Sequence, residues 1–169
     1  MAAGSTYTPI ATTTLGSTTA SYTFTSIPGT YTDLVLVLGN VNVTDAAQNL
    51  LQFNSDTGSN YSRTALSGQG TAPSSGRTSN ETSIMLETTF YPSFNGNKDY
   101  TGIWNIMNYS NTTTYKTVIG RGSSASVGTG ASASLWRSTS AITSIKIQPA
   151  YGYSYSSGAV FTLYGIKAA

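Results

Sequence analysis

The chain has 169 residues and a mass of 17.7 kDa, the usual size of one domain with a core of its own. Only 8% of its residues are charged, against about 25% in an average soluble domain, and the formal net charge is +2. So small a charge gives no strong field for collecting phosphates or for holding an anionic membrane surface. We therefore expect neither nucleic acid nor a membrane as a partner.

The chain contains no cysteine and no histidine. Their absence removes thiol nucleophiles, disulfides, thiolate or imidazole metal sites, and acid–base chemistry by an imidazole. We therefore expect no enzymatic activity and no cofactor. Residues 1–8 lack the basic region and apolar run of a signal peptide, and no stretch approaches the ~18 apolar residues of a membrane span.

Residues 1–15 are polar and nearly uncharged, with Pro9 and five threonines among them. Alone, such a segment buries too little surface to offset its ordering entropy, which predicts an N-terminal arm that orders only in an assembly. A neighbouring subunit would accept it as an added strand, with Tyr7 and Ile10 as anchors. Residues 16–169 are expected to form a single domain.

Alternation of apolar and hydroxyl side chains begins at residues 22–27 and stops at the turn signal Pro28-Gly29. Residues 33–43 are the most apolar run and predict a central strand buried on both faces, because Gly39-Asn40 interrupts any helical period. The one helical candidate is a short turn over residues 44–50. Further strands are predicted at residues 50–53, 62–66, 82–87, 100–108, 114–120, 132–136, 142–148 and 160–166.

This pattern predicts an all-β fold, an antiparallel β-sandwich of the jelly-roll type, because each strand has one apolar face that only an opposing sheet can cover. Trp104 and Trp136 lie within strand runs and are expected in the core. The polar faces carry mostly hydroxyl groups, and few charges mean little repulsion between copies. We therefore expect a homo-oligomer, a trimer by closed symmetry.

Several passages carry a resemblance: YTPIATTTLG at residues 7–16, YTFTSIPGTYTDL at 22–34, FNSDTGSNY at 53–61, and ITSIKI at 142–147 with FTLYGI at 161–166. They resemble structural proteins of tailed bacteriophages, including cyanobacterial and marine phages. The resemblance implies a non-enzymatic β-domain on the exterior of the virion, first of all an oligomeric decoration or cement protein. Its partners would be other copies and capsid or other virion proteins. The alternative is a tail or fibre domain that recognises host-surface glycans.

Tyr151, Tyr153 and Tyr155 occupy positions i, i+2 and i+4, which share one face of an extended segment. Tyrosine is large, stiff and amphipathic, so the three phenols fit a subunit interface or a platform on which a sugar stacks. They fit equally an aromatic loop that packs on its own sheet. The sequence leaves these alternatives open.

The loop Asp56-Thr57-Gly58-Ser59 has the form of an aspartic-protease loop, and residues 118–121 follow at the spacing of the supporting segment. Protease chemistry needs a dimer around Asp56 and an apolar strand into the loop, but Asn54 and Ser55 are polar. The loop oxygens also suit Ca²⁺, yet one carboxylate is too few. A turn held by the Asp56 side chain is the favoured interpretation.

Overall fold

The computed structural model describes residues 6–45, 47–86, 100–124 and 128–167. Within these ranges the chain forms twelve strands and one short 3-10 helix, η1. In chain order they are β1 (Tyr7–Thr14), β2 (Tyr22–Phe24), β3 (Asp33–Val41), β4 (Asn49–Phe53), β5 (Tyr61–Gln69), β6 (Ala72–Glu81), β7 (Ile84–Met85), β8 (Tyr100–Met107), β9 (Lys116–Ser124), β10 (Gly128–Trp136), β11 (Ile145–Pro149), η1 (Ala150–Gly152) and β12 (Val160–Ile166).

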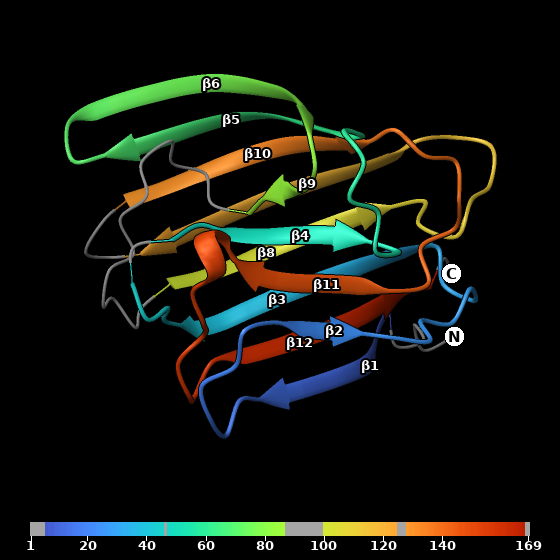
Figure 1. The fold of residues 1–169 in the computed structure, drawn as a ribbon. Helices are drawn as coiled ribbons and strands as arrows, with labels where there is room; N and C mark the ends of the chain where they lie inside the picture. The colour runs from blue at the N-terminus through green and yellow to red at the C-terminus, as the bar shows by residue number, and fades with distance from the viewer. Residues whose placement is uncertain (1–5, 46, 87–99, 125–127, 168–169) are drawn as a thin grey trace.

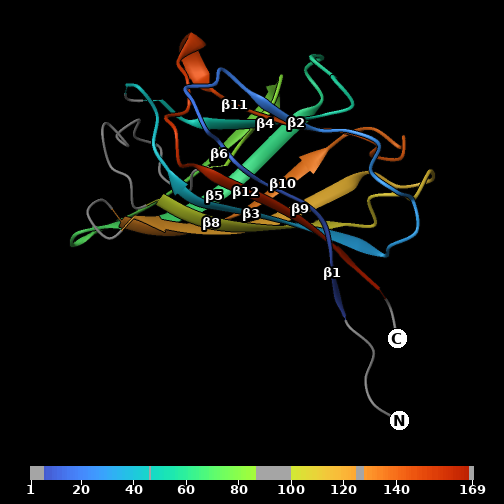
Figure 2. The same ribbon diagram turned by 90° about the horizontal axis from the view of Figure 1, so that it is seen from below.

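The strands form two antiparallel sheets that pack face to face, which confirms the predicted β-sandwich (Figures 1 and 2). The larger sheet has eight strands in the order β1-β12-β3-β8-β9-β10-β5-β6, and the smaller has four in the order β2-β11-β4-β7. In Figure 2 the larger sheet is the lower layer and the smaller sheet lies above it.

The strand order is that of a jelly roll with two insertions. β1-β12-β3-β8 faces β2-β11-β4-β7, and the chain crosses from one sheet to the other at every connection except β5–β6, β8–β9 and β9–β10. The hairpins β5–β6 and β9–β10 are added beyond β8. The larger sheet therefore extends past the smaller one, and Figure 1 shows β5 and β6 reaching beyond β4.

The core lies between the sheets and consists of aliphatic and aromatic side chains from both. β3 is a central strand as predicted, between β12 and β8, with Leu34, Leu36 and Leu38 fully buried. On its other face Val35 is buried, but Val37 is only partly covered. Burial on both faces is therefore confirmed for part of the strand.

Both tryptophans are buried, as predicted, and Trp104 depends on two glycines, Gly102 of its own strand β8 and Gly120 of the neighbouring strand β9. A Cβ atom on Gly120 would lie 2.0 Å from Trp104 Cδ1, and one on Gly102 would lie 2.1 Å from Trp104 Cη2. The missing side chains make the space that the indole fills. Packing at native density leaves no room for a methyl group there.

The prediction of a separate N-terminal arm is wrong for residues 7–14. They form β1, an edge strand of the domain's own larger sheet, paired with β12 from Tyr7 opposite Ile166 to Thr14 opposite Val160. Backbone hydrogen bonds to β12 and the packing of Ile10 and Ala11 against the core supply the free energy that offsets the ordering entropy of this polar segment. Residues 1–5 lie outside the described residues.

Two other predictions are also wrong in part. No helical turn forms in the described part of residues 44–50, where Asn49 already begins β4. The strand predicted at residues 82–87 is shortened to Ile84–Met85, and residue 87 lies outside the described ranges. β6 was missed because nearly all its side chains are polar or small, so it shows no apolar alternation.

Candidate functional site

The outer face of the eight-stranded sheet, which we call the outer sheet face, is covered by no other layer of the described residues (Figure 2). Strand register aligns its apolar side chains in rows: Val37 lies opposite Ile103 in one row, and Asn105 lies between Val35 and Ile119 in the next. The apolar members of this face include Tyr7, Val35, Val37, Leu66, Ile103, Met107, Ile119, Ala131, Ala133, Leu135, Val160, Tyr164 and Ile166.

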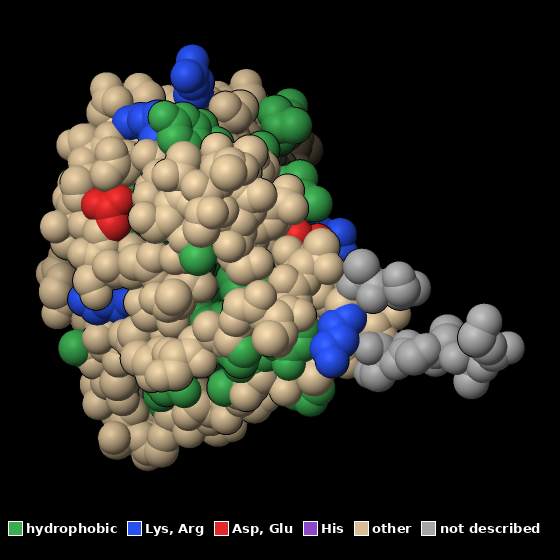
Figure 3. Space-filling view, turned by 90° about the vertical axis from the view of Figure 1, so that its right-hand side faces the viewer, with side chains coloured by type: hydrophobic (Ala, Val, Ile, Leu, Met, Phe, Trp, Pro, Cys, Tyr) green, Lys and Arg blue, Asp and Glu red, His purple; other side chains and the backbone are tan. Residues whose placement is uncertain are grey.

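Exposure of large apolar side chains is concentrated on this face. Of the six exposed large hydrophobic side chains in the described residues, four lie on it: Tyr7 at 53%, Leu66 at 61%, Met107 at 37% and Ile119 at 48%. Monomeric proteins rarely leave a large contiguous apolar patch in water, and such patches mark interaction surfaces. At the end of the sandwich near the termini, hydrophobic side chains are scattered among backbone and side chains that are neither hydrophobic nor charged (Figure 3).

The outer sheet face is hollowed and carries charges of both signs. One depression of about 360 Å³ is lined by Tyr7, Met107 and Ile119, with Asp33 at its side. A second, of about 250 Å³, lies against Ile103 and includes Arg121. A second sheet surface with side chains in rows is the kind of partner that fills such hollows.

The edges of the same sheet carry features that discourage strand pairing. β1 contains Pro9, which cannot donate to a ladder, and its register is irregular between Pro9 and Ala11. β6 contains Pro73 and Arg77 and ends at Glu81. Proline and charge are the usual devices that keep an edge strand from accepting another chain. The apolar surface available for association is therefore the face rather than the edges.

Tyr7 and Ile10, the predicted anchors of a donated strand, have different environments. Tyr7 is exposed and its ring meets that of Tyr164 edge to face at 6.1 Å between centroids, so it belongs to the outer sheet face. Ile10 packs against the core of its own domain. Its side chain is therefore committed within the domain.

The prediction that Tyr151, Tyr153 and Tyr155 share one face is wrong, because η1 interrupts the extended backbone. Tyr155 is fully buried, and its ring packs on Phe161 at 5.0 Å between centroids. Tyr153 is half-buried against the edge of the core. Only Tyr151 is widely exposed, at 74%.

Tyr151 has a left-handed backbone conformation, with φ 58° and ψ 19°. A bulky residue at positive φ is a true outlier and costs roughly 1–2 kcal/mol relative to glycine. Its ring gains little burial in return, since among the described residues it meets the ring of Tyr153 alone, edge to face at 6.5 Å. Residues held in such a conformation cluster at functional sites, which makes Tyr151 a candidate binding residue.

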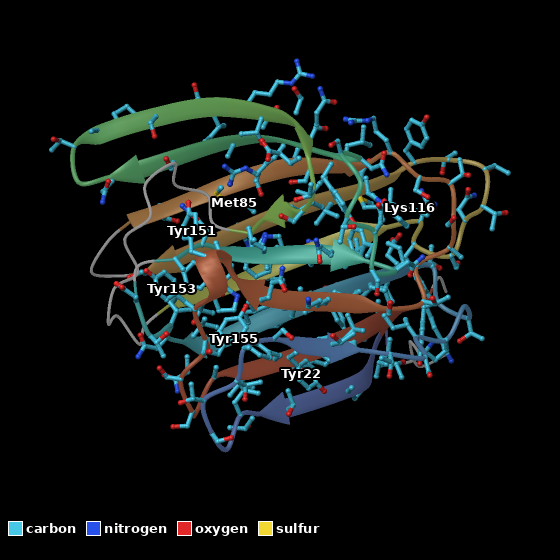
Figure 4. The ribbon with its side chains drawn as sticks, viewed as in Figure 1. Tyr22, Met85, Lys116, Tyr151, Tyr153 and Tyr155 are labelled. Atoms are coloured by element: carbon cyan, nitrogen blue, oxygen red, sulfur yellow. The ribbon has the colours of Figure 1, made fainter. Side chains whose placement is uncertain are left out.

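Tyr153 is joined to a carboxylate. Its hydroxyl donates a hydrogen bond to Asp45, and the negative charge of Asp45 raises the pKa of the Tyr153 phenol. Tyr151, Tyr153 and Asp45 lie at one end of the smaller sheet, beside η1, where Figure 4 labels the two tyrosines. We call these three residues the tyrosine–aspartate cluster.

The Asp56 loop is a turn held by the Asp56 side chain, which was the interpretation favoured from the sequence. Asp56 Oδ1 accepts from the Gly58 backbone N–H at 2.8 Å, and Oδ2 accepts from Asn60 Nδ2 at 2.9 Å and from the Trp136 indole N–H at 2.7 Å. Burial alone would raise the pKa of Asp56, but these three donors outweigh it and hold the pKa below its usual value. A carboxylate that accepts from three N–H groups organises the loop. The same oxygens would have to share a proton in an aspartic protease or bind the cation in a Ca²⁺ site, and here they accept these hydrogen bonds instead.

Lys116 is a buried charge that the sequence analysis did not single out. Its side chain is fully buried, and Nζ donates to the carbonyl oxygens of Thr114 at 2.8 Å and Thr139 at 3.1 Å. Burial lowers the pKa of the ammonium group. A lysine enclosed in this way ties two loops together and is not accessible as a nucleophile (Figure 4).

The described residues contain no group of three or more Asp, Glu, His or Cys side chains arranged to hold a metal ion. Nor does any helix in the described ranges have the length and apolar character needed to span a membrane. No protein-family model matches the chain, and no curated protein shows significant similarity to it.

Proposed function

We propose that this protein is a non-enzymatic structural protein of a tailed-phage virion, an oligomer that decorates the capsid exterior and associates through the outer sheet face. The observation that carries the association is the concentration of exposed apolar side chains on that one face of a weakly charged chain. The virion setting rests on the resemblance of residues 7–34, 53–61 and 142–166 to tailed-phage structural proteins.

The occupant that fits the outer sheet face is a second copy of this chain. Eight strands about 4.8 Å apart, each about eight residues long, span roughly 900 Å², against the roughly 800 Å² per partner of a standard stable interface. The face carries Asp33 and Arg121 at separate places, so a rotated copy brings opposite charges together. A sheet with rows of Val, Ile and Met is also covered well by another such sheet.

Two measurements test this proposal. Sedimentation velocity at micromolar concentration should show an oligomer of at least two copies at both low and high NaCl, because apolar contacts dominate the interface. A monomer under both conditions would overturn the association. Antibody labelling of intact particles in the electron microscope should decorate the head, and label found only on the tail would overturn the capsid assignment.

A second candidate function, a tail or fibre domain that recognises host-surface glycans, is favoured by one specific observation. Tyr151 holds a large aromatic ring in solvent on a strained backbone. Binding of the purified protein to an array of bacterial surface glycans would test this candidate directly.

A further inference from the structure

We propose that the tyrosine–aspartate cluster, Tyr151, Tyr153 and Asp45, is a binding site for a neutral sugar, with Tyr151 as the stacking surface and Asp45 as a hydroxyl acceptor. This inference rests on the second candidate function and names its site and its ligand class. It is independent of the outer sheet face, which belongs to the other sheet.

The site is built on a short antiparallel ladder between the segment before β4 and the segment after η1. Thr44 N–H donates to the Ser154 carbonyl at 2.9 Å, and Ser154 N–H donates back to Thr44 Oγ1 at 3.2 Å. One step along, Val43 and Tyr155 form a β-bridge, with both side chains buried in the core. These contacts fix the backbone beside Asp45 and Tyr153, so the cluster is held in place before a ligand arrives.

Tyr151 supplies the stacking surface. Three quarters of its side chain is exposed, and its contact with Tyr153 is nearly perpendicular, with 78° between the ring planes. An edge-to-face contact fixes the ring while leaving much of its surface open. The C–H face of a pyranose packs on such a ring, and tyrosine loses little side-chain entropy when it is held.

Asp45 supplies the polar contact. Its side chain is exposed and accepts the Tyr153 hydroxyl. A carboxylate has about four lone-pair positions and accepts several donors at once, and the exposed side chain of Asp45 is within reach of a ligand placed over Tyr151. The exposed Thr44 hydroxyl lies next to it in the chain and adds a group that both donates and accepts.

The chemistry of these groups selects a neutral polyol. Asp45 is the charged member of the cluster, and its negative charge repels acidic sugars and phosphorylated ligands. A purely apolar ligand would cover the carboxylate without giving it a hydrogen bond. A quaternary ammonium ligand is best held when several ring faces surround it, whereas here the two rings contact each other edge to face.

The test compares the full-length protein with Tyr151→Gly. Glycine adopts positive φ without strain, so this variant removes the ring and also relieves the backbone. The matched control is Tyr115→Gly, which removes a tyrosine that is 53% exposed in the loop between β8 and β9. Ligand-observed NMR with a panel of neutral oligosaccharides, one acidic oligosaccharide and choline measures binding, and thermal unfolding measures stability.

We expect binding of at least one neutral oligosaccharide, at least tenfold weaker in Tyr151→Gly and changed less than twofold in Tyr115→Gly. The midpoint of thermal unfolding of Tyr151→Gly should equal or exceed that of the wild type, which a tyrosine kept only for packing would not produce. Saccharide binding that survives in Tyr151→Gly would overturn this site but leave the glycan-recognition function standing. No saccharide binding, either to this panel or to a bacterial surface-glycan array, would overturn both. Preference for choline or for the acidic sugar would overturn the ligand class.

Discussion

Ile119→Asp is the sharpest perturbation of the outer sheet face. The isoleucine lies near the middle of the face on β9 and is 48% exposed, so roughly half of its burial remains to be gained on association. Full burial of such a side chain is worth about 1.5–3 kcal/mol, which makes the lost apolar contact about 1 kcal/mol. An aspartate buried there without a partner adds a desolvation penalty of several kcal/mol.

A total of about 3 kcal/mol or more corresponds to a dissociation constant raised more than a hundredfold. We therefore expect Ile119→Asp to sediment as a monomer at concentrations where the wild type is an oligomer. The free energy of unfolding of the Ile119→Asp domain should be within about 1 kcal/mol of the wild-type value, because the substituted side chain is half exposed to solvent.

Thr23→Asp provides the control, since it places the same charge on an exposed position of β2 in the smaller sheet. It should leave the dissociation constant within a factor of two. If Ile119→Asp and Thr23→Asp associate equally well, the outer sheet face is not the interface, and the argument from exposed apolar side chains is wrong.

Three further predictions concern the fold. Gly120→Ala should destabilise the protein by about 2 kcal/mol or more in chemical denaturation, because its Cβ would overlap Trp104, whereas Gly68→Ala, which meets nothing within 4 Å, should change stability by under about 1 kcal/mol. Asp56 has a lowered pKa, so it contributes stability above the usual value of 3.8 that is lost as the pH falls through its folded pKa. Unfolding measured from pH 7 to 2 should show this loss in the wild type and a smaller one in Asp56→Asn. Deletion of residues 1–14 should lower the midpoint of thermal unfolding, because β12 loses its β1 partner. An unchanged midpoint would instead support the prediction that these residues are an arm separate from the domain.

The sequence predicted the fold class and most strands because the core strands alternate clearly. β8 shows this well: Trp104 and Ile106 point inward, while Ile103 and Met107 stand on the other side. The sequence of β8 also indicates the outer sheet face, because apolar residues occur at its outward-pointing positions as well as at its inward-pointing ones. Alternation identifies which residues share a face, but it does not tell which faces a second layer covers.

The missed elements share a physical cause. β1 and β6 are polar edge strands whose order comes from backbone pairing with β12 and β5, and side-chain pattern carries little of that information. The tyrosine prediction failed for a different reason. The positive φ at Tyr151 belongs to a residue type that rarely adopts it, so period-two counting placed the three tyrosines on one face, whereas Tyr151 is exposed and Tyr155 is in the core.

The two inserted hairpins link the topology to the proposed association. A jelly roll without them would have four strands in each sheet. The inner face of each sheet, covered by the opposite sheet, would then equal its uncovered outer face in area. By adding β9, β10, β5 and β6 to one side of β8, the chain doubles the width of one sheet. The added strands bring Ile119, Ala131 and Leu66 to the outer face, next to Val37 and Ile103 of the original four. Four strands alone span under 20 Å at about 4.8 Å each, too little for a standard interface, so the hairpins bring the face to a size that a second copy can bind.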